Sequence, residues 1–259
     1  MKISVITVPY NSGKTIADTL DSLAVQTYLN VEHIVVDGAS TDETLARIRN
    51  HRNPNIRLVS EPDKGIYDAM NKGLALGSGY VVGFLNSDDV YADTTVLEKV
   101  AAVFKDKSVE VCYADLVYGT KDNNRIARYW KSKPFHKGDF SKGWCPAHPT
   151  FYIRKSALQR LGSFDQSFKL AADVEFMMRY LEQGAVKSVY IPQVFVRMRL
   201  GGATNQSWEN VWKQNIEIFA ALRKNKVPFS LVMFWVCKFF NRAWQHLAAR
   251  FFNTVSLSR

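Results

Sequence analysis

The first half of the chain alternates short apolar runs with segments whose apolar residues recur at helical spacing. The apolar runs are ISVITV, VEHIVVDG, IRLVSE and YVVGFLNSDD, and the helical patterns between them are TIADTLDSLAVQ, DETLARIRNH and IYDAMNKGLALG. This alternation predicts βαβ units, in which helices cover both faces of a mostly parallel sheet. A chain of 259 residues, 47% of them apolar, can bury a large core. We therefore expect one α/β domain with an appendage.

The turn after the first expected strand reads YNSGKT and resembles part of a phosphate-binding P-loop. A P-loop carries a second glycine five residues before the glycine of Gly-Lys-Thr, and that position is Val8 here. The next residue, Pro9, has no backbone N–H to donate to a phosphate. The sequence therefore argues against a P-loop NTPase.

Charge is unevenly spread along the chain. Residues 1–120 hold 11 basic and 16 acidic residues, whereas residues 221–259 hold 7 basic residues and no acidic one. A basic segment favours anionic lipid, nucleic acid or a phosphate-bearing substrate. Because no nucleic-acid-binding signature is present, we expect no nucleic-acid partner. The scattered cysteines and the lack of a signal peptide predict a cytoplasmic protein.

Polar and acidic residues follow three of the expected strands. Asp37 ends the second strand, EPDKGIYDAMNKG follows the third, and NSDD (residues 86–89) follows the fourth. Because the carboxyl ends of parallel strands form the ligand crevice of such sheets, we expect these groups to lie together. Asp88 and Asp89 would suit a hard divalent cation, although ordinary loop acids give the same pattern.

Five stretches, found in order over most of the chain, resemble the bacterial family-2 glycosyltransferases of the GT-A fold: SVITVPYNSGKTIADTLDSLAVQTY, EHIVVDGASTDET, EPDKGIYDAMNKG, FLNSDD and AADVEFMMR. The resemblance implies a Rossmann-like, mixed and mostly parallel sheet with flanking helices. Residues 1–205 would be the catalytic domain, and residues 206–259 a C-terminal helical extension. The implied activity is inverting transfer from a UDP-, GDP- or dTDP-sugar to a hydroxyl of a glycan or lipid-linked acceptor, in exopolysaccharide or lipopolysaccharide synthesis.

Carried onto this sequence, the resemblance also implies roles for single residues. Asp173 matches the catalytic base. Asp88 and Asp89 match the ligands of Mn²⁺ or Mg²⁺, whereas Asn86 replaces the first acid of the usual Asp-x-Asp-Asp pattern. The residues implied on the nucleotide and donor side are Pro9, Tyr10, Asp37, Asp63, Lys64, Asn86, Ser87, Arg197 and Arg199. Those implied on the acceptor side are Trp144, His148 and Glu175.

Several of these residues also have plain structural interpretations. Asp173 would equally suit the start of a helix, where the helix dipole stabilises an acid. A lone histidine such as His148 is more often structural than catalytic. Arg197 and Arg199 precede a Gly-Gly turn; Arg199 stands where the family often has a histidine, and either arginine could be a surface charge.

The tail has a helical pattern from Trp208 to Asn225, a break at Pro228, and then an aromatic and basic segment. Its uninterrupted apolar run, Leu231 to Cys237, is far shorter than the roughly twenty residues needed to span a bilayer. We expect peripheral contact with the inner face of the cytoplasmic membrane, near a lipid-linked acceptor. The alternative is a helix hairpin that packs against the catalytic domain or a second subunit.

Two other functions share the crevice and the acids. A nucleotidyltransferase would make a sugar nucleotide, but no Gly-rich loop bearing Arg or Lys follows the first strand. Asn86 is the main reason to consider a non-catalytic sugar-nucleotide-binding protein. The presence of Asp88, Asp89 and Asp173 argues against that function.

Overall fold

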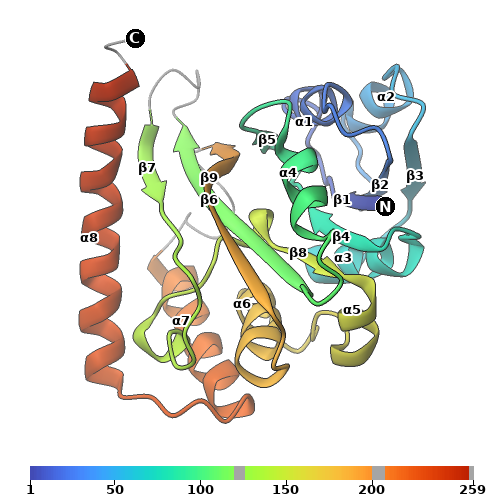
Figure 1. Cartoon of the computed structure of the whole chain (residues 1–259). Coiled ribbons are helices and arrows are strands. Elements are labelled where there is room, and N and C mark those ends of the chain that lie inside the picture. Colours follow the sequence, from blue (N-terminus) through green and yellow to red (C-terminus); the bar gives the residue numbers. More distant parts are fainter. Residues whose placement is uncertain (120–125, 200–207, 257–259) are drawn as a thin grey trace.

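The computed structural model describes residues 1–119, 126–199 and 208–256 (Figure 1). Its strands are β1 (Ile3–Thr7), β2 (Val31–Asp37), β3 (Ile56–Ser60), β4 (Val81–Phe84), β5 (Val90–Tyr91), β6 (Val111–Gly119), β7 (Ile126–Trp130), β8 (Tyr152–Arg154) and β9 (Ser188–Arg199). Its helices are α1 (Ile16–Ala24), α2 (Thr44–Arg49), α3 (Ile66–Leu76), α4 (Val96–Val103), α5 (Lys155–Leu161), α6 (Ala172–Met178), α7 (Trp208–Lys224) and α8 (Leu231–Ser256). Two 3₁₀ turns, η1 (Phe140–Lys142) and η2 (His148–Thr150), and a π-helical turn, η3 (Arg179–Gln183), complete the described elements.

The strands form a single mixed sheet with the order β3-β2-β1-β4-β8-β6-β9-β5, and β7 pairs with β6. Strands β1 to β4 are parallel, with Ile3 opposite both Val31 and Val81. The four predicted strands and three predicted helices of the first half are therefore confirmed. The carboxyl ends of β1 to β4 lie at one edge of the sheet, where the sequence concentrates its polar residues.

The second half of the sheet is mixed in direction. Strand β8 is antiparallel to both β4 and β6, β9 is parallel to β6, and β5 is antiparallel to β9. Strand β5 follows the NSDD loop directly, so its pairing with β9 brings Val90 opposite Arg197. This pairing places the end of β9 beside the loop that carries Asp88.

Helices cover both faces of the sheet, so the strands β1, β2 and β4 are buried on both sides. On one face, side chains from β1 and β4 pack with α3, α5 and α6 in the largest apolar cluster. On the other face, Leu23 of α1 and Leu97 of α4 pack with Ile3 and Val5. Strands buried on both faces read as continuous apolar runs, as this sequence does.

The C-terminal helices pack on the rest of the chain. Helix α8 runs along β7 (Figure 1), where Arg128 Nε donates a hydrogen bond of 2.6 Å to Gln245 Oε1. Ala249 is buried at this contact, with Tyr129 of β7, and Phe234 near the start of α8 is buried against Phe219 of α7. The packing alternative is therefore confirmed for one face of α8. The expected boundary at residues 205 and 206 lies outside the described residues. None of the described helices is long and apolar enough to span a bilayer.

Candidate active site

The opening turn, YNSGKT, forms hydrogen bonds with the NSDD loop. The hydroxyls of Ser12 and Ser87 lie 2.8 Å apart, and Thr15 Oγ1 donates to the backbone oxygen of Ser87 at 2.9 Å. One helical turn later, Thr19 Oγ1 donates to the backbone oxygen of Asp89 at 2.8 Å. These hydroxyl residues hold the loop against the start of α1. The turn that looks like a P-loop thus positions the acidic loop beside it.

Within the loop, Asn86 and Asp89 form a pair. Asn86 Nδ2 donates to Asp89 Oδ2 at 2.8 Å, and Asp89 is fully buried. Burial raises the pKa of Asp89 well above its usual range, and the neighbouring charge of Asp88 raises it further. Asp88 itself is half-buried, and burial raises its pKa as well. The amide of Asn86 supplies a hydrogen-bond donor to the buried carboxyl of Asp89, so asparagine at this position has a local physical reason.

The loop offers a limited set of ligands to a divalent cation. Across residues 1–119, 126–199 and 208–256, no cluster of three or more His, Cys, Asp or Glu side chains could hold a metal. Asp88 contributes a partly exposed carboxylate, while Asp89 Oδ1 is a buried oxygen with no partner among the described atoms. Mg²⁺ and related ions are often held by one or two carboxylates together with substrate phosphates and water. Asp88 and Asp89 therefore suit a divalent cation whose remaining ligands would come from a bound diphosphate.

The two arginines of β9, Arg197 and Arg199, differ in their contacts near the NSDD loop. Arg197 is exposed and lies opposite Val90 of β5. Arg199 pairs with Asp18 of α1, and its charge acts to lower the pKa values of both acids of the loop. Its Nε is buried without a partner in the part of the chain that the structure describes. Arg199 is thus the better placed of the two to meet an anion at the loop. The Gly-Gly turn that follows lies outside the described residues.

The end of β2 forms a closed turn. Asp37 is buried and accepts hydrogen bonds from Ser40 N at 3.0 Å, Ser40 Oγ at 2.5 Å and Ser60 Oγ at 2.8 Å. Pro9 is also buried, and its backbone oxygen accepts from Gly38 N at 3.0 Å. The carboxylate of Asp37 therefore organises this turn rather than facing solvent, and its expected contact with a nucleotide stays a prediction.

Two residues expected to bind the sugar-nucleotide donor lie close to the backbone at Gly38. A Cβ at this position would lie 2.4 Å from Asp63 Oδ2 and 3.4 Å from the ring of Tyr10. Tyr10 is exposed, and Asp63 Oδ1 accepts from Gly65 N at 2.7 Å. Tyr10 and Asp63 thus both lie close to Gly38, and their roles on the sugar-nucleotide side stay predictions.

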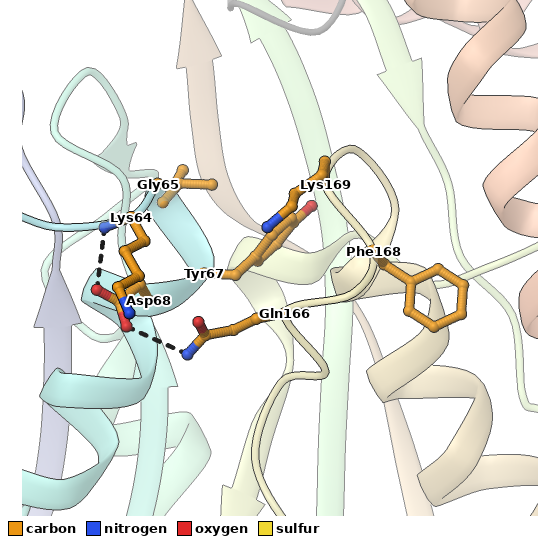
Figure 2. Close-up of a pocket in the computed structure, with 8 residues that line it drawn as sticks. Lys64, Gly65, Tyr67, Asp68, Gln166, Phe168 and Lys169 are labelled. Carbon is orange, nitrogen blue, oxygen red and sulfur yellow. Dashed lines mark hydrogen bonds between the residues drawn. The ribbon is translucent and has the colours of Figure 1, made fainter.

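Lys64 lines a shallow pocket at the start of α3 (Figure 2). Its backbone N–H donates to Asp68 Oδ2 at 3.0 Å, and its side chain is exposed. The residues that line the pocket are Lys64, Gly65, Ile66, Tyr67, Asp68, Gln166, Phe168 and Lys169. The pocket joins the segment after β3 to the segment before α6, which places Lys64 near the helix that carries Asp173.

Asp173 lies in the first turn of α6 and is half-buried. Its Oδ1 accepts hydrogen bonds from the hydroxyl of Tyr67 at 3.1 Å and from Val174 N at 2.9 Å. His148 is buried nearby, with its ring 4.9 Å from that of Phe84, the last residue of β4. Burial lowers the pKa of His148, although the charge of Asp173 opposes this shift. His148 therefore packs on the end of β4 and lies close enough to Asp173 to feel its charge.

The contacts of Glu175 do not fit the acceptor role expected for it. Glu175 is fully buried, with carboxylate oxygens 3.0 Å from Arg179 Nη2 and 3.0 Å from Lys224 Nζ. It is a structural acid that ties α6 to the end of α7. Trp144 lies in an aromatic cluster, with its ring 6.0 Å from Phe140, and its acceptor role stays a prediction. Sequence reasoning gave no role to Tyr67, although this residue lies within the EPDKGIYDAMNKG motif.

Comparison with known proteins identifies the family. Residues 4–168 match the family model for glycosyl transferase family 2. A PGL/p-HBAD biosynthesis glycosyltransferase of Mycobacterium tuberculosis is 31% identical over 208 residues, which cover 78% of each chain. The chondroitin synthase of Pasteurella multocida is 27% identical over 188 residues, covering 71% of this chain and 19% of that protein.

Solved structures share the fold. S. aureus TarS in complex with UDP-GlcNAc has a TM-score of 0.67 and 23% sequence identity to this chain. The match covers 86% of this chain and 66% of that chain. The mannosyltransferase PcManGT from Pyrobaculum calidifontis, in complex with GDP-Man and Mn²⁺, matches 98% of this chain and 87% of its own at a TM-score of 0.59 and 18% identity. With the family match over residues 4–168, these findings show that the chain is a glycosyltransferase of family 2 with the GT-A fold.

Proposed function

We propose that the chain is an inverting, metal-dependent glycosyltransferase that uses a nucleotide sugar and a hydroxyl acceptor. The donor would be a UDP-, GDP- or dTDP-sugar, and the acceptor a glycan or lipid-linked glycan in bacterial surface-polysaccharide synthesis. Residues 1–205 would form the catalytic domain and residues 206–259 the extension. Family membership favours sugar transfer over the nucleotidyltransferase alternative.

One observation supports the proposal, namely the surroundings of the carboxylate that would act as base. Asp173 contacts Tyr67 of α3 and lies near His148, which packs on Phe84. Phe84 ends β4, the strand that leads into the NSDD loop with Asp88. A proton acceptor and a diphosphate site are the two groups that a single inverting displacement requires.

In the proposed reaction, Oδ2 of Asp173 takes the proton of the acceptor hydroxyl. The acceptor oxygen forms a bond to the anomeric carbon as the bond from that carbon to the diphosphate oxygen breaks. The electron pair of the broken bond stays on the nucleoside diphosphate. Mn²⁺ or Mg²⁺ held at Asp88, with Asp89 Oδ1 beside it, would stabilise the diphosphate charge when bound. Arg199, at the end of β9, supplies a protein cation near the same loop.

The first experiment is calorimetric titration of the purified chain with UDP, GDP and dTDP, each with Mn²⁺ and with chelator. We expect one of the three to bind in a metal-dependent manner. The Asp88→Ala variant should lose most of the metal dependence, because it removes the partly exposed carboxylate. If a folded sample binds none of the three, the donor-site assignment is wrong.

A second experiment tests the base. Asp173→Asn should abolish sugar transfer while leaving the affinity for the nucleoside diphosphate nearly unchanged, because it removes the proton acceptor but not the donor pocket. Glu175→Gln is the matched control, since it removes a neighbouring carboxylate that faces a buried ion pair. Transfer that survives in Asp173→Asn would place the base elsewhere.

The membrane contact proposed for this enzyme involves the outer face of α8. This face exposes large apolar side chains, among them Phe239 at 71% and Phe240 at 66%. The tail around them has basic residues and no acidic one from residue 221 onward. An exposed aromatic face on a basic helix favours the interface of an anionic bilayer. Its opposite face packs on β7, so α8 would present the catalytic domain to the lipid.

Vesicle co-sedimentation tests this contact. The chain should bind phosphatidylglycerol vesicles more strongly than phosphatidylcholine vesicles, and the double variant Phe239→Ser, Phe240→Ser should lose most of that binding. Leu29→Ser is the control, because Leu29 is an exposed apolar residue at the loop before β2. If the chain does not bind vesicles and instead forms a dimer in light scattering, and if the double variant dissociates that dimer, then the exposed face of α8 contacts a second copy of the chain.

A further inference from the structure

Tyr67 connects the donor-side pocket to the proposed base. It lies in the first turn of α3, between the loop of Lys64 and Gly65 and the segment from Gln166 to Lys169 (Figure 2). Its hydroxyl donates to Asp173 Oδ1 at 3.1 Å, although 106 residues separate the two in sequence. Tyr67 is therefore a side chain of the pocket wall that also contacts Asp173.

The two oxygens of Asp173 are in different situations. Oδ1 accepts two hydrogen bonds, from the hydroxyl of Tyr67 and from Val174 N. Oδ2 has no hydrogen-bond partner among the described residues. We propose that Tyr67 is a positioning residue that holds Oδ1 and so directs Oδ2 toward the acceptor hydroxyl. This inference rests on the proposed role of Asp173 as the base.

The surroundings keep this arrangement fixed. The ring of Tyr67 lies 5.6 Å from that of Phe164, a buried residue. The segment before α6 is held by Glu217 of α7, whose carboxylate accepts the backbone N–H groups of Lys169, Leu170 and Ala171 at 2.8 to 2.9 Å. Burial raises the pKa of Tyr67 strongly, and the charge of Asp173 adds to this shift. The phenol therefore stays protonated and remains a hydrogen-bond donor at every physiological pH.

The hydrogen bond has a consequence that a conservative variant can measure. A donor that binds the charged form of a carboxylate stabilises that form. Titratable groups near this pair include His148 of η2, Cys145 of the preceding loop and Glu217 of α7. Lys64, Asp68 and Lys169 line the same pocket as Tyr67. Tyr67→Phe leaves all of these groups in place and removes only the phenolic hydroxyl, so the carboxylate should rotate more freely.

The test compares Tyr67→Phe with the wild type and with Tyr190→Phe. Tyr190 is a matched control because its hydroxyl also donates to a carboxylate, Asp115 Oδ1 at 2.9 Å. Protein labelled with ¹³C at the aspartate carboxyl carbons is compared by NMR at neutral pH, and the Asp173 signal is identified by its absence in Asp173→Asn. The chemical shift of this signal should change in Tyr67→Phe, which loses the hydrogen bond to Oδ1, and stay unchanged in Tyr190→Phe.

A rate measurement accompanies the NMR comparison. With the sugar nucleotide whose nucleoside diphosphate binds, and water as acceptor, Tyr67→Phe should lower kcat about tenfold at neutral pH with little change in KM. An unchanged Asp173 signal in Tyr67→Phe, or an equal change in Tyr190→Phe, overturns the inference. Transfer that survives in Asp173→Asn overturns the proposed base instead, whatever the Asp173 signal does.

Discussion

Replacing Glu175 with glutamine tests whether this carboxylate is structural, as its contacts indicate. The fully buried carboxylate lies 3.0 Å from Arg179 and 3.0 Å from Lys224. Removing one partner of a buried ion pair typically costs about 3–5 kcal/mol, because the opposite charge is left uncompensated. Here Lys224 is 43% exposed and also pairs with Asp165, so its part of the cost is small. We expect Glu175→Gln to lower the free energy of unfolding by about 2–3 kcal/mol.

The pH dependence of this effect follows from the pKa of Glu175. Burial raises this pKa, but hydrogen bonds and charges from Arg179 and Lys224 outweigh burial and lower it from its usual value of 4.5. A carboxyl whose pKa is lower in the folded state stabilises the fold above its unfolded pKa, and this contribution disappears as the pH falls through the folded value. The difference between wild type and variant should therefore be full at pH 6–8 and shrink below about pH 4.5.

Urea unfolding followed by tryptophan fluorescence measures both effects. Glu209→Gln is the matched control, because Glu209 forms an exposed pair with Lys213 four residues along α7. The control should change the free energy of unfolding by less than about 0.5 kcal/mol. Stability equal to wild type in Glu175→Gln, or a loss that is constant from pH 4 to pH 8, would refute the assignment of Glu175 as a structural ion-pair acid.

Two further substitutions test the loops at the sheet edge. Asn86→Asp would remove the amide that donates to buried Asp89 Oδ2 at 2.8 Å, so it should lower the free energy of unfolding by about 1–3 kcal/mol in chelator. Urea unfolding that matches the wild type would contradict this. Gly38→Ala should weaken nucleoside diphosphate binding about tenfold in calorimetry, since its Cβ would lie 2.4 Å from Asp63 Oδ2. An unchanged affinity would remove Asp63 from the donor pocket.

Local sequence patterns predicted the parallel half of the fold. The runs that became β1 to β4 and the helical segments that became α1 to α3 each encode their structure through the spacing of apolar residues, which is a local property. The same reasoning placed Asp88 at the crevice, because the carboxyl ends of parallel strands share an edge. The helical tail and its break at Pro228 were predicted in the same way.

The roles of buried polar groups could not be predicted in this way. Glu175 and Asp173 are two residues apart in one acidic motif, yet Asp173 contacts Tyr67 of α3 whereas Glu175 contacts a cation from α7. The bond from Tyr67 to Asp173 joins residues 106 positions apart, and the bonds that close Asp37 into its turn come from both Ser40 and Ser60. Such contacts depend on how distant elements meet, and neither the residue types nor their spacing specify that.

The opening turn shows why a short motif needs its structural context. Gly-Lys-Thr after a strand can cradle a phosphate only if successive backbone N–H groups are free to curl around it. In this chain Gly13 N donates to Asp42 Oδ2 at 3.0 Å, and the hydroxyls of Ser12 and Thr15 are engaged with Ser87. The donors that a P-loop would offer to a nucleotide are instead used inside the protein. They fix the loop that carries Asp88, so the turn contributes to the proposed donor site by supporting its acidic loop.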